Sequence, residues 1–179
     1  MADSTLSRTQ VLGNRTTFTF SVWIKRSLLN DYQNILSTGT DTTYRTQLAW
    51  HEDDIIQFYN NDNSVNMELK TTRKFRDTSA WYHIVLRFDT TQGTAADRIR
   101  LYVNGEQETS FSTATYPAQD NDSTMFNKNG NTVKIGSTAY ASSNFFNGYM
   151  SHAVFVDGAS LGPTSFGETD STSGIWKFK

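Results

Sequence analysis

Cysteine is missing from this chain of 179 residues, which excludes disulfide bridges and thiolate metal sites. No stretch approaches the roughly 18 consecutive apolar residues that a helix needs to cross a membrane. Residues 1–8 also lack the apolar core of a secretory signal peptide. We therefore expect no membrane insertion and no general secretion. If the protein acts outside a cell, we expect it to leave by lysis or by a dedicated route.

Charge of one sign is also missing. The 16 basic and 18 acidic residues nearly cancel, and they form no long run. Proteins that bind nucleic acid carry a basic surface that neutralises phosphates. The balance of charge therefore gives no electrostatic reason to expect nucleic acid as a partner.

Aromatic residues, in contrast, make up 13% of the chain, whereas proline occurs only twice. Together with abundant threonine, serine and asparagine, this composition is typical of β proteins. The clearest local signal lies at residues 98–107 (RIRLYVNGEQ), where apolar and polar side chains alternate as in a half-buried strand. Asn104 and Gly105 then supply the two positive φ angles of a type I′ hairpin turn.

Similar strand signals recur along the chain, and no helical segments of comparable strength separate them, which excludes a parallel α/β fold. We predict an all-β fold, an antiparallel two-sheet β-sandwich of jelly-roll type with little or no helix, formed by residues 1–166. Residues 167–179 are expected to be a C-terminal tail or the start of a continuing segment. Strands are expected at 18–25, 33–37, 44–50, 55–59, 65–72, 81–89, 98–103, 107–111, 133–136 and 145–156, with a long polar loop at 112–131 and one helical turn at 161–166. In the last strand, Gly148 marks a bulge or a close backbone approach. The apolar residues Met150, Ala153 and Phe155 break strict alternation there, which also favours a bulge.

Five segments of the chain form a recognisable series: residues 18–25 (FTFSVWIK), 81–85 (WYHIV), 101–105 (LYVNG), 133–136 (VKIG) and 146–150 (FNGYM). In their order and spacing, across residues 5–166, the chain resembles the laminin-G-like branch of the concanavalin A-like lectin/glucanase superfamily. The resemblance implies a lectin-like sandwich that serves recognition and is not an enzyme.

Four further segments carry a narrower similarity: residues 6–9 (LSRT), 23–26 (WIKR), 155–158 (FVDG) and 166–177 (FGETDSTSGIWK). In these segments the chain is similar to laminin-G-like domains in tail and fibre proteins of tailed phages, notably marine ones. The similarity implies a virion component that is assembled in the host cytoplasm and acts outside the cell. The implied partners are other virion subunits, including copies of the chain itself in a homo-oligomer, and a host-surface glycan.

The chain departs from that family at both ends, where members carry a further strand, and these two terminal strands lie side by side. Three explanations are open: a naturally trimmed version, a fragment, or a sheet that a neighbouring chain completes by strand addition. At His152 relatives often carry an acidic residue, so a role for that carboxylate is not expected here.

Catalysis is not expected. Glucanases of the superfamily use paired carboxylates at alternating positions of one strand, whereas the nearest acidic cluster here, residues 52–54 (EDD), falls in a predicted turn. His51, His83 and His152 are scattered and form no nucleophile–base or metalloprotease motif. We interpret His83 as a structural, hydrogen-bonding histidine within its strand.

No motif requires a cofactor. The resemblance implies Ca²⁺ as the ion to consider, held by carboxylate and carbonyl oxygens at the edge of the sandwich. The alternative is that acidic side chains in such turns cap their own backbone. The candidate ligands are Asp53, Asp54, Asp62, Asp120 and Asp122.

Glycan binding is the sharper hypothesis, because lectin sites combine an aromatic platform with amide and hydroxyl groups on loops. For each candidate, the alternative is that its side chain packs in the core or at a subunit contact. Trp23 and Trp81 are assigned to the sandwich, and Trp176 to the anchoring of the tail or to an interface. The candidates for sugar contact are Tyr44, Trp50, Tyr59, Tyr116, Tyr140, Asn144 and Phe145.

The leading hypothesis is a non-enzymatic virion module of a tailed phage, in a tail, a fibre or another surface appendage, that binds host-surface glycans. The alternative is a purely structural capsid or appendage subunit that binds no glycan. A glycan-active enzyme of the same superfamily is a third hypothesis, which the absence of paired carboxylates disfavours.

Overall fold

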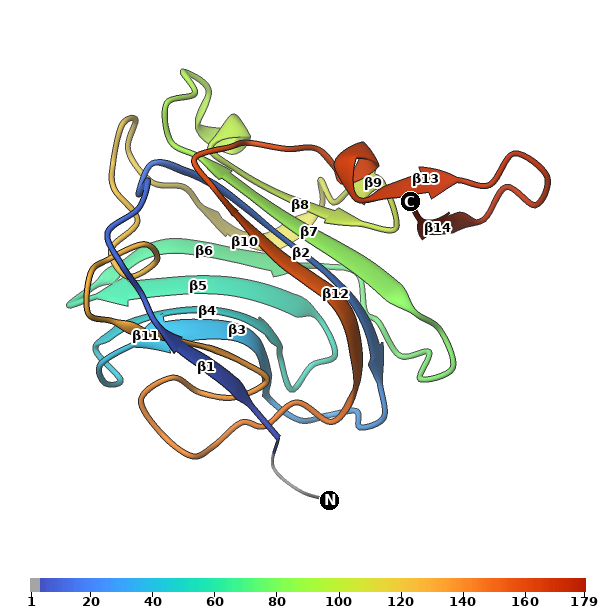
Figure 1. Cartoon of the computed structure of the whole chain (residues 1–179), viewed down its shortest axis with the longest axis horizontal. Coiled ribbons are helices and arrows are strands. Elements are labelled where there is room, and N and C mark those ends of the chain that lie inside the picture. The colour runs from blue at the N-terminus through green and yellow to red at the C-terminus, as the bar shows by residue number, and fades with distance from the viewer. Residues whose placement is uncertain (1–3) are drawn as a thin grey trace.

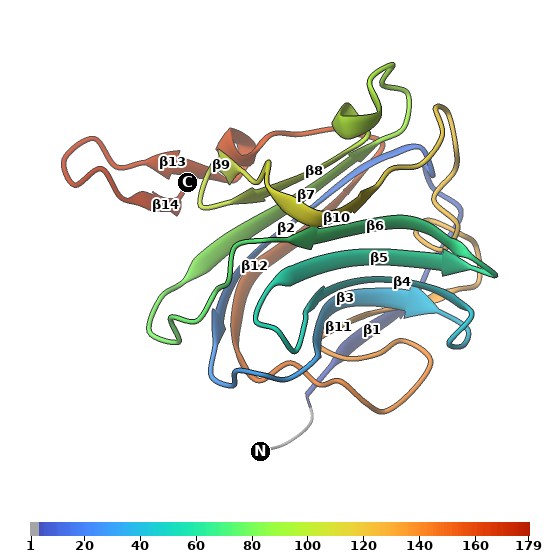
Figure 2. The ribbon, with the colours of Figure 1, turned by 180° about the vertical axis from the view of Figure 1, so that it is seen from behind.

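The computed structural model describes residues 4–179, and these form strands and loops with little helix. Two antiparallel sheets face each other across the core, as Figures 1 and 2 show from opposite sides. Helix within this range is limited to two single 3-10 turns, η1 (Ala95–Asp97) and η2 (Pro163–Ser165). The predicted all-β, two-sheet sandwich is confirmed. The same residues contain no helix with the length and apolar character needed to cross a membrane.

The larger sheet has seven strands in the order β1-β11-β3-β4-β5-β6-β10, and the smaller has five in the order β12-β2-β7-β8-β9. A separate two-stranded hairpin joins β13 to β14. The bounds are β1 (Leu6–Thr9), β2 (Thr17–Arg26), β3 (Gln33–Gly39), β4 (Tyr44–Trp50), β5 (Ile56–Asp62), β6 (Val65–Thr71), β7 (Tyr82–Asp89), β8 (Ile99–Val103), β9 (Glu106–Gln107), β10 (Phe111–Thr115), β11 (Thr132–Ile135), β12 (Gly148–Asp157), β13 (Gly167–Thr169) and β14 (Trp176–Phe178).

Alternating apolar side chains of both sheets meet in one core. On β2, Phe18 and Phe20 have no exposed surface. The ring of Phe18 stacks on that of Phe88 in β7, with 4.6 Å between centroids. Burial of such side chains contributes about 1.5–3 kcal/mol each, so this alternation fixes which face of each strand turns inward.

The hairpin at Asn104 and Gly105 has the predicted geometry, with φ angles of 52° and 85°. Its return strand differs from the prediction. Glu106–Gln107 pairs with β8 and the Glu108 N–H still donates to the carbonyl of Leu101, but the chain then crosses to the larger sheet, where β10 pairs with β6. The local sequence of residues 107–111 could not show this, because pairing partners in another sheet leave no local trace.

The bulge that the broken apolar pattern of β12 favours is confirmed, because the register of β12 against β2 shifts between Ser151 and Val154. Gly148 lies outside this bulge, in regular register with Arg26, and marks a close approach instead. At Gly148, φ is +147° and a Cβ atom would lie 2.0 Å from the carbonyl oxygen of Lys25. Only glycine allows the two backbones to approach so closely.

The segment expected to be a long polar loop, 112–131, contains β10 at its start and then closes one end of the sandwich. Phe126 has no exposed surface, and its ring packs edge-on against Phe18 at 5.5 Å. The side chain of Gln10 donates to the carbonyl of Met125 and accepts from the N–H of Asn127. These contacts give this segment a structural role.

The C-terminal segment begins with the expected helical turn, η2, and continues as the β13–β14 hairpin, which projects beyond the sheets beside β9 (Figure 1). Trp176 fixes this hairpin to the smaller sheet. Its indole N–H donates to Nδ1 of His83 over 2.9 Å, and its ring covers Gly105 and Gly167. The hairpin is therefore attached to the turn that the sequence shows most clearly.

Candidate functional site

A polar pocket of about 390 Å³ lies on the outer face of the larger sheet. Side chains of β4, β5 and β6 alternate between the core and this face. The strand register places Gln47 beside Tyr59 and Tyr59 beside Glu68 in one row, and Gln57 beside Lys70 in the next. The pocket is lined by Tyr32, Arg45, Gln47, His51, Gln57, Tyr59, Glu68, Lys70, Tyr140 and Asn144.

The loop 136–147, between β11 and β12, forms one wall of the pocket. It is held on the sheet by Asn34, whose backbone N–H donates to the carbonyl of Asn144 over 2.9 Å. The Asn34 side-chain amide donates to the Thr138 hydroxyl, also over 2.9 Å. These bonds bring Tyr140 and Asn144 to the row of outward side chains on β4 and β5.

Tyr32 and three side chains of β5 and β6 form a chain of polar contacts along the pocket. Tyr32 packs edge-on against His51 with 5.8 Å between ring centroids. Burial raises the pKa of the Tyr32 phenol well above its usual range, so the hydroxyl stays protonated and donates to Oε1 of Gln57 over 3.1 Å. The Gln57 amide and the Lys70 ammonium both reach Oε1 of Glu68, at 2.6 and 3.3 Å.

Arg45 joins the floor to the loop wall. Its guanidinium carbon lies 5.1 Å from the centroid of the Tyr59 ring, and its Nη1 donates to the Tyr140 hydroxyl over 3.0 Å. Because that hydroxyl accepts from Arg45, its own proton remains free to donate into the pocket. The two tyrosines hold the guanidinium in one orientation.

Of the seven residues predicted to contact sugar, the structure brings three together in this pocket: Tyr59, Tyr140 and Asn144. The prediction for Trp50 is wrong, because this side chain is fully buried in the core and packs against Phe75 with 5.3 Å between ring centroids. The alternation of β4 contained this information, since Trp50 shares its face with the buried Leu48.

The other three candidates lie outside the pocket. Tyr44 is 38% exposed at the start of β4 and pairs across the ladder with Asp62. Tyr116 is partly buried against the core, and burial raises the pKa of its phenol. Phe145 is half-buried in the same loop as Asn144 but does not line the pocket.

Sequence reasoning missed the polar side chains that form the pocket floor. Arg45, Gln47, Gln57, Glu68 and Lys70 occupy the outward positions of three consecutive strands. A signal was present, because such positions alternate with the apolar ones. What the sequence did not show was the register that brings these side chains of the three strands side by side.

The acidic side chains proposed as Ca²⁺ ligands do not gather. Among residues 4–179, no group of three His, Cys, Asp or Glu side chains is placed to hold a metal ion. Asp54 is fully buried and its carboxylate oxygens lie 3.2 Å from both Arg26 and Arg76. Asp54 therefore belongs to a buried ion-pair network, and its prediction as a metal ligand is wrong. Of the remaining candidates, Asp53 donates its backbone N–H to Nδ1 of His51 over 3.2 Å, and Asp122 pairs with Arg15 at 2.8 Å. Asp62 and Asp120 form no ion pair with any of the described residues.

His83 has the structural role that was predicted for it. It is fully buried, stacks on Trp23 with 4.7 Å between centroids, and bonds Ser21 at 2.9 Å through Nε2. Trp81, which was expected among the sandwich aromatics, precedes β7 and stays 41% exposed. None of these residues lines the polar pocket.

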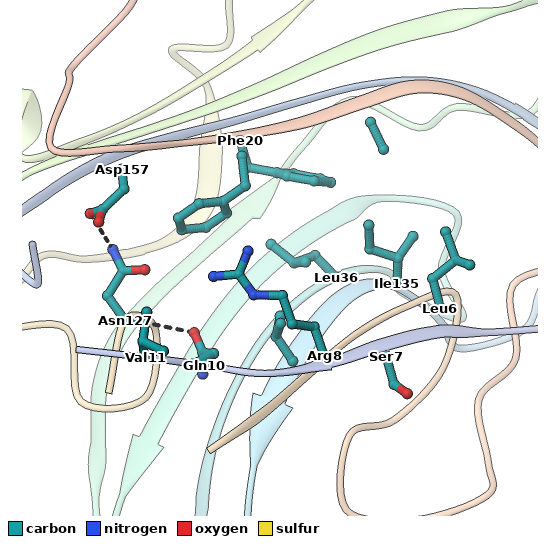
Figure 3. Close-up of a pocket in the computed structure, with 13 residues that line it drawn as sticks. Leu6, Ser7, Arg8, Gln10, Val11, Phe20, Leu36, Asn127, Ile135 and Asp157 are labelled. Atoms are coloured by element: carbon teal, nitrogen blue, oxygen red, sulfur yellow. Dashed lines mark hydrogen bonds between the residues drawn. The ribbon is translucent and has the colours of Figure 1, made fainter. Parts of the chain in front are cut away.

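A second cavity, of about 290 Å³, lies between β1 and β12, the edge strands of the two sheets (Figure 3). Leu6, Leu36 and Ile135 give it an apolar wall, and Arg8 projects into it. Asn127 and Asp157 close one end through a 2.9 Å hydrogen bond. Both amides of its lining, Gln10 and Asn127, already make hydrogen bonds within the fold.

Comparison with known proteins agrees with this geometry. The model of one family, described as the concanavalin A-like lectin/glucanases superfamily, matches residues 2–162. No curated protein matches the chain.

Solved structures with the same fold include several from carbohydrate-related proteins. Domain 4 of AbnA, an extracellular arabinanase of Geobacillus stearothermophilus solved with arabinotriose, has a TM-score of 0.65 and 16% identity over 88% of this chain and 68% of that one. The sialidase module CBM40 of Ruminococcus gnavus, bound to sialyllactose, has a TM-score of 0.58 and 13% identity over 92% and 96%. A heptameric pentraxin of Limulus polyphemus has a TM-score of 0.58 and 18% identity over 84% and 68%. At these identities, the likeness shows the fold.

Proposed function

Since the chain belongs to the concanavalin A-like lectin/glucanases superfamily, we propose that it is a non-enzymatic glycan-binding module whose site is the polar pocket on the larger sheet. The observation that carries this proposal is the lining of the pocket. Amides, phenols and a guanidinium converge there from three strands and one loop, and such groups exchange hydrogen bonds with sugar hydroxyls.

The same lining argues against hydrolysis. Glycosidases of the common type flank the scissile bond with two carboxyl groups, about 5–10 Å apart. Among the described residues that line this pocket, Glu68 is the one carboxylate, and its Oε1 is already taken by Gln57 and Lys70. A pocket of this kind can bind a sugar but lacks the second carboxyl group that hydrolysis requires.

Two structures of the same fold support the choice of ligand. The arabinanase domain is described with arabinotriose and the sialidase module with sialyllactose. Neither is close enough in sequence for its ligand to be transferred residue by residue. They make a carbohydrate the first class of ligand to test.

We further propose that the module is part of a phage virion, in a tail, a fibre or another surface appendage, as a homo-oligomer in contact with other virion subunits. Support comes from the sequence similarity to phage tail and fibre domains described above. Mass spectrometry of purified particles tests this role directly. Detection of the chain in particles freed of host protein is the expected result, and its absence from them contradicts the proposal.

A purely structural subunit is the second candidate, and the apolar cavity between β1 and β12 favours it. Leu6 and Val11, which line that cavity, are 70% and 67% exposed. Exposed apolar side chains at a sheet edge are typical of surfaces that contact another protein.

A glycan array separates the two candidates. We expect the wild-type protein to bind at least one glycan, and the variant Tyr140→Ala/Asn144→Ala to lose that binding. Tyr44→Ala is the matched control, because Tyr44 is an exposed tyrosine outside the pocket. Failure of the wild type to bind any glycan, with and without Ca²⁺, contradicts the proposal and favours the structural subunit.

A further inference from the structure

The pocket on the larger sheet contains an arginine whose charge no carboxylate balances. Among the described residues, every arginine other than Arg8 and Arg45 forms an ion pair with a carboxylate or donates to a backbone carbonyl. Within the same residues, Arg45 is held by the Tyr140 hydroxyl and the face of the Tyr59 ring, and by no carboxylate. A half-buried guanidinium without a counter-charge is a ready receptor for an anion.

The other charges that line the pocket do not change this balance. The Lys70 ammonium lies 3.3 Å from Glu68, so these two charges offset each other. Among the arginine, lysine and glutamate side chains that line the pocket, Arg45 then leaves a surplus of one positive charge. The surplus lies between the floor and the loop wall.

The guanidinium is also oriented to accept a ligand. Nη1 uses one of its protons for Tyr140, and Nη2 makes no hydrogen bond to any described residue. The remaining N–H groups at the end of the fork match two oxygens of a carboxylate or a sulfate. The free proton of the Tyr140 hydroxyl adds a neutral donor beside them.

We propose that this pocket selects acidic glycans, those in which a sugar carries a carboxylate or a sulfate, and that Arg45 determines this specificity by pairing with the anionic group. The inference rests on the proposed glycan binding and deepens it. The amides of Gln47, Gln57 and Asn144 then bond the neutral hydroxyls of the same ligand.

Matched ligands test the inference by isothermal titration calorimetry on the whole chain. Sialyllactose and sulfated lactose are compared with lactose, which lacks the anionic group. We expect an acidic form to bind at least about tenfold more tightly than lactose, the range of a charge-assisted hydrogen bond. The two acidic ligands separate carboxylate from sulfate as the preferred group. Added salt is expected to reduce this preference in the wild-type protein.

Substitutions then locate the preference. Arg45→Gln is expected to abolish it, Arg45→Lys to retain part of it, and Arg8→Gln, in the apolar cavity, to leave it unchanged. Thermal unfolding of each variant shows whether it is folded. The salt dependence of binding is measured on the wild-type protein, so it tests the inference even where a variant does not fold. Equal binding of acidic and neutral sugars, or a preference that survives Arg45→Gln, overturns the inference while glycan binding stands. Binding of no sugar in the panel or the array overturns both.

Discussion

The indole N–H of Trp176 donates to Nδ1 of His83 over 2.9 Å, although the two residues are 93 positions apart in the chain. Because Nδ1 accepts this bond, the ring proton of the neutral histidine lies on Nε2 and is donated to the Ser21 hydroxyl. The imidazole is therefore fixed in one tautomer between two sheet residues and the C-terminal hairpin. Protonation of Nδ1 would place two donors against each other.

Stability is expected to fall in mildly acidic solution because of His83. Burial lowers the pKa of this group from 6.5 to about 4. Between these values the unfolded chain binds a proton that the folded one does not, so the contribution of His83 is complete above pH 6.5 and is lost as pH falls toward 4. The loss amounts to about 3 kcal/mol at most. Urea unfolding across this range measures it. His83→Gln should flatten the curve, and a curve that keeps its slope in this variant would contradict the assignment to His83.

Loss of the indole N–H should loosen the C-terminal hairpin. Trp176→Phe keeps a ring over Gly105 and Gly167 but leaves buried Nδ1 of His83 without its donor, at a cost of about 1–3 kcal/mol. Hydrogen exchange of residues 167–178 should become faster. Ile175→Ala is the control, because Ile175 is 66% exposed. Equal protection in the two variants would show that the bond does not hold the hairpin.

Two glycines with nearly the same φ angle allow the cost of backbone strain to be measured apart from the cost of a steric clash. Gly105 and Gly130 have φ of +85° and +83°. A Cβ atom at Gly105 would lie 2.6 Å from the Trp176 ring, whereas a Cβ atom at Gly130 would have no atom within 4 Å. Gly130→Ala should cost about 1–2 kcal/mol through its backbone alone. Gly105→Ala should cost more, since it also displaces Trp176. Thermal unfolding compares them, and equal losses would contradict the packing of Trp176 on this turn.

The buried ion pair of Arg26 and Asp54 should be costly to break from one side. Burial opposes ionisation of Asp54, but the Asn30 N–H, Arg76 and Arg26 outweigh it and lower the pKa of the carboxyl. This contribution is present above the unfolded pKa and is lost in stronger acid. Asp54→Asn leaves Arg26 buried without a counter-charge, a loss of about 3–5 kcal/mol. Adding Arg26→Met should recover part of it. A double variant less stable than Asp54→Asn would argue against this account.

Trp50 should affect stability where Tyr44 does not. Trp50→Ala removes a fully buried ring from the core and should cost about 3–5 kcal/mol. Tyr44→Ala changes an exposed ring and should cost little. Chemical denaturation of the two variants checks this, and a small effect of Trp50→Ala would restore Trp50 to the aromatic residues that a ligand can reach.

Most of the strands could be predicted because their signals are local. Alternation identified β2, β4, β5 and β7 close to their observed bounds, and the break in the pattern of β12 marked its bulge. The crossing of the chain from β9 to β10 was missed, since a strand has the same period in either sheet. Three of the pocket residues, Tyr59, Tyr140 and Asn144, were named from residue type alone, and type alone also named the buried Trp50.

By itself, the sequence determined the alternation that gives each strand a buried face, and the Asn104-Gly105 turn that reverses the chain. Only the tertiary structure decided that Arg45 meets Tyr140, 95 positions away, and that Trp176 meets His83. The physical reason is the range of the forces that set each feature. Backbone sterics and side-chain periodicity act within a few residues, whereas contacts between sheets and loops depend on how all the strands are stacked.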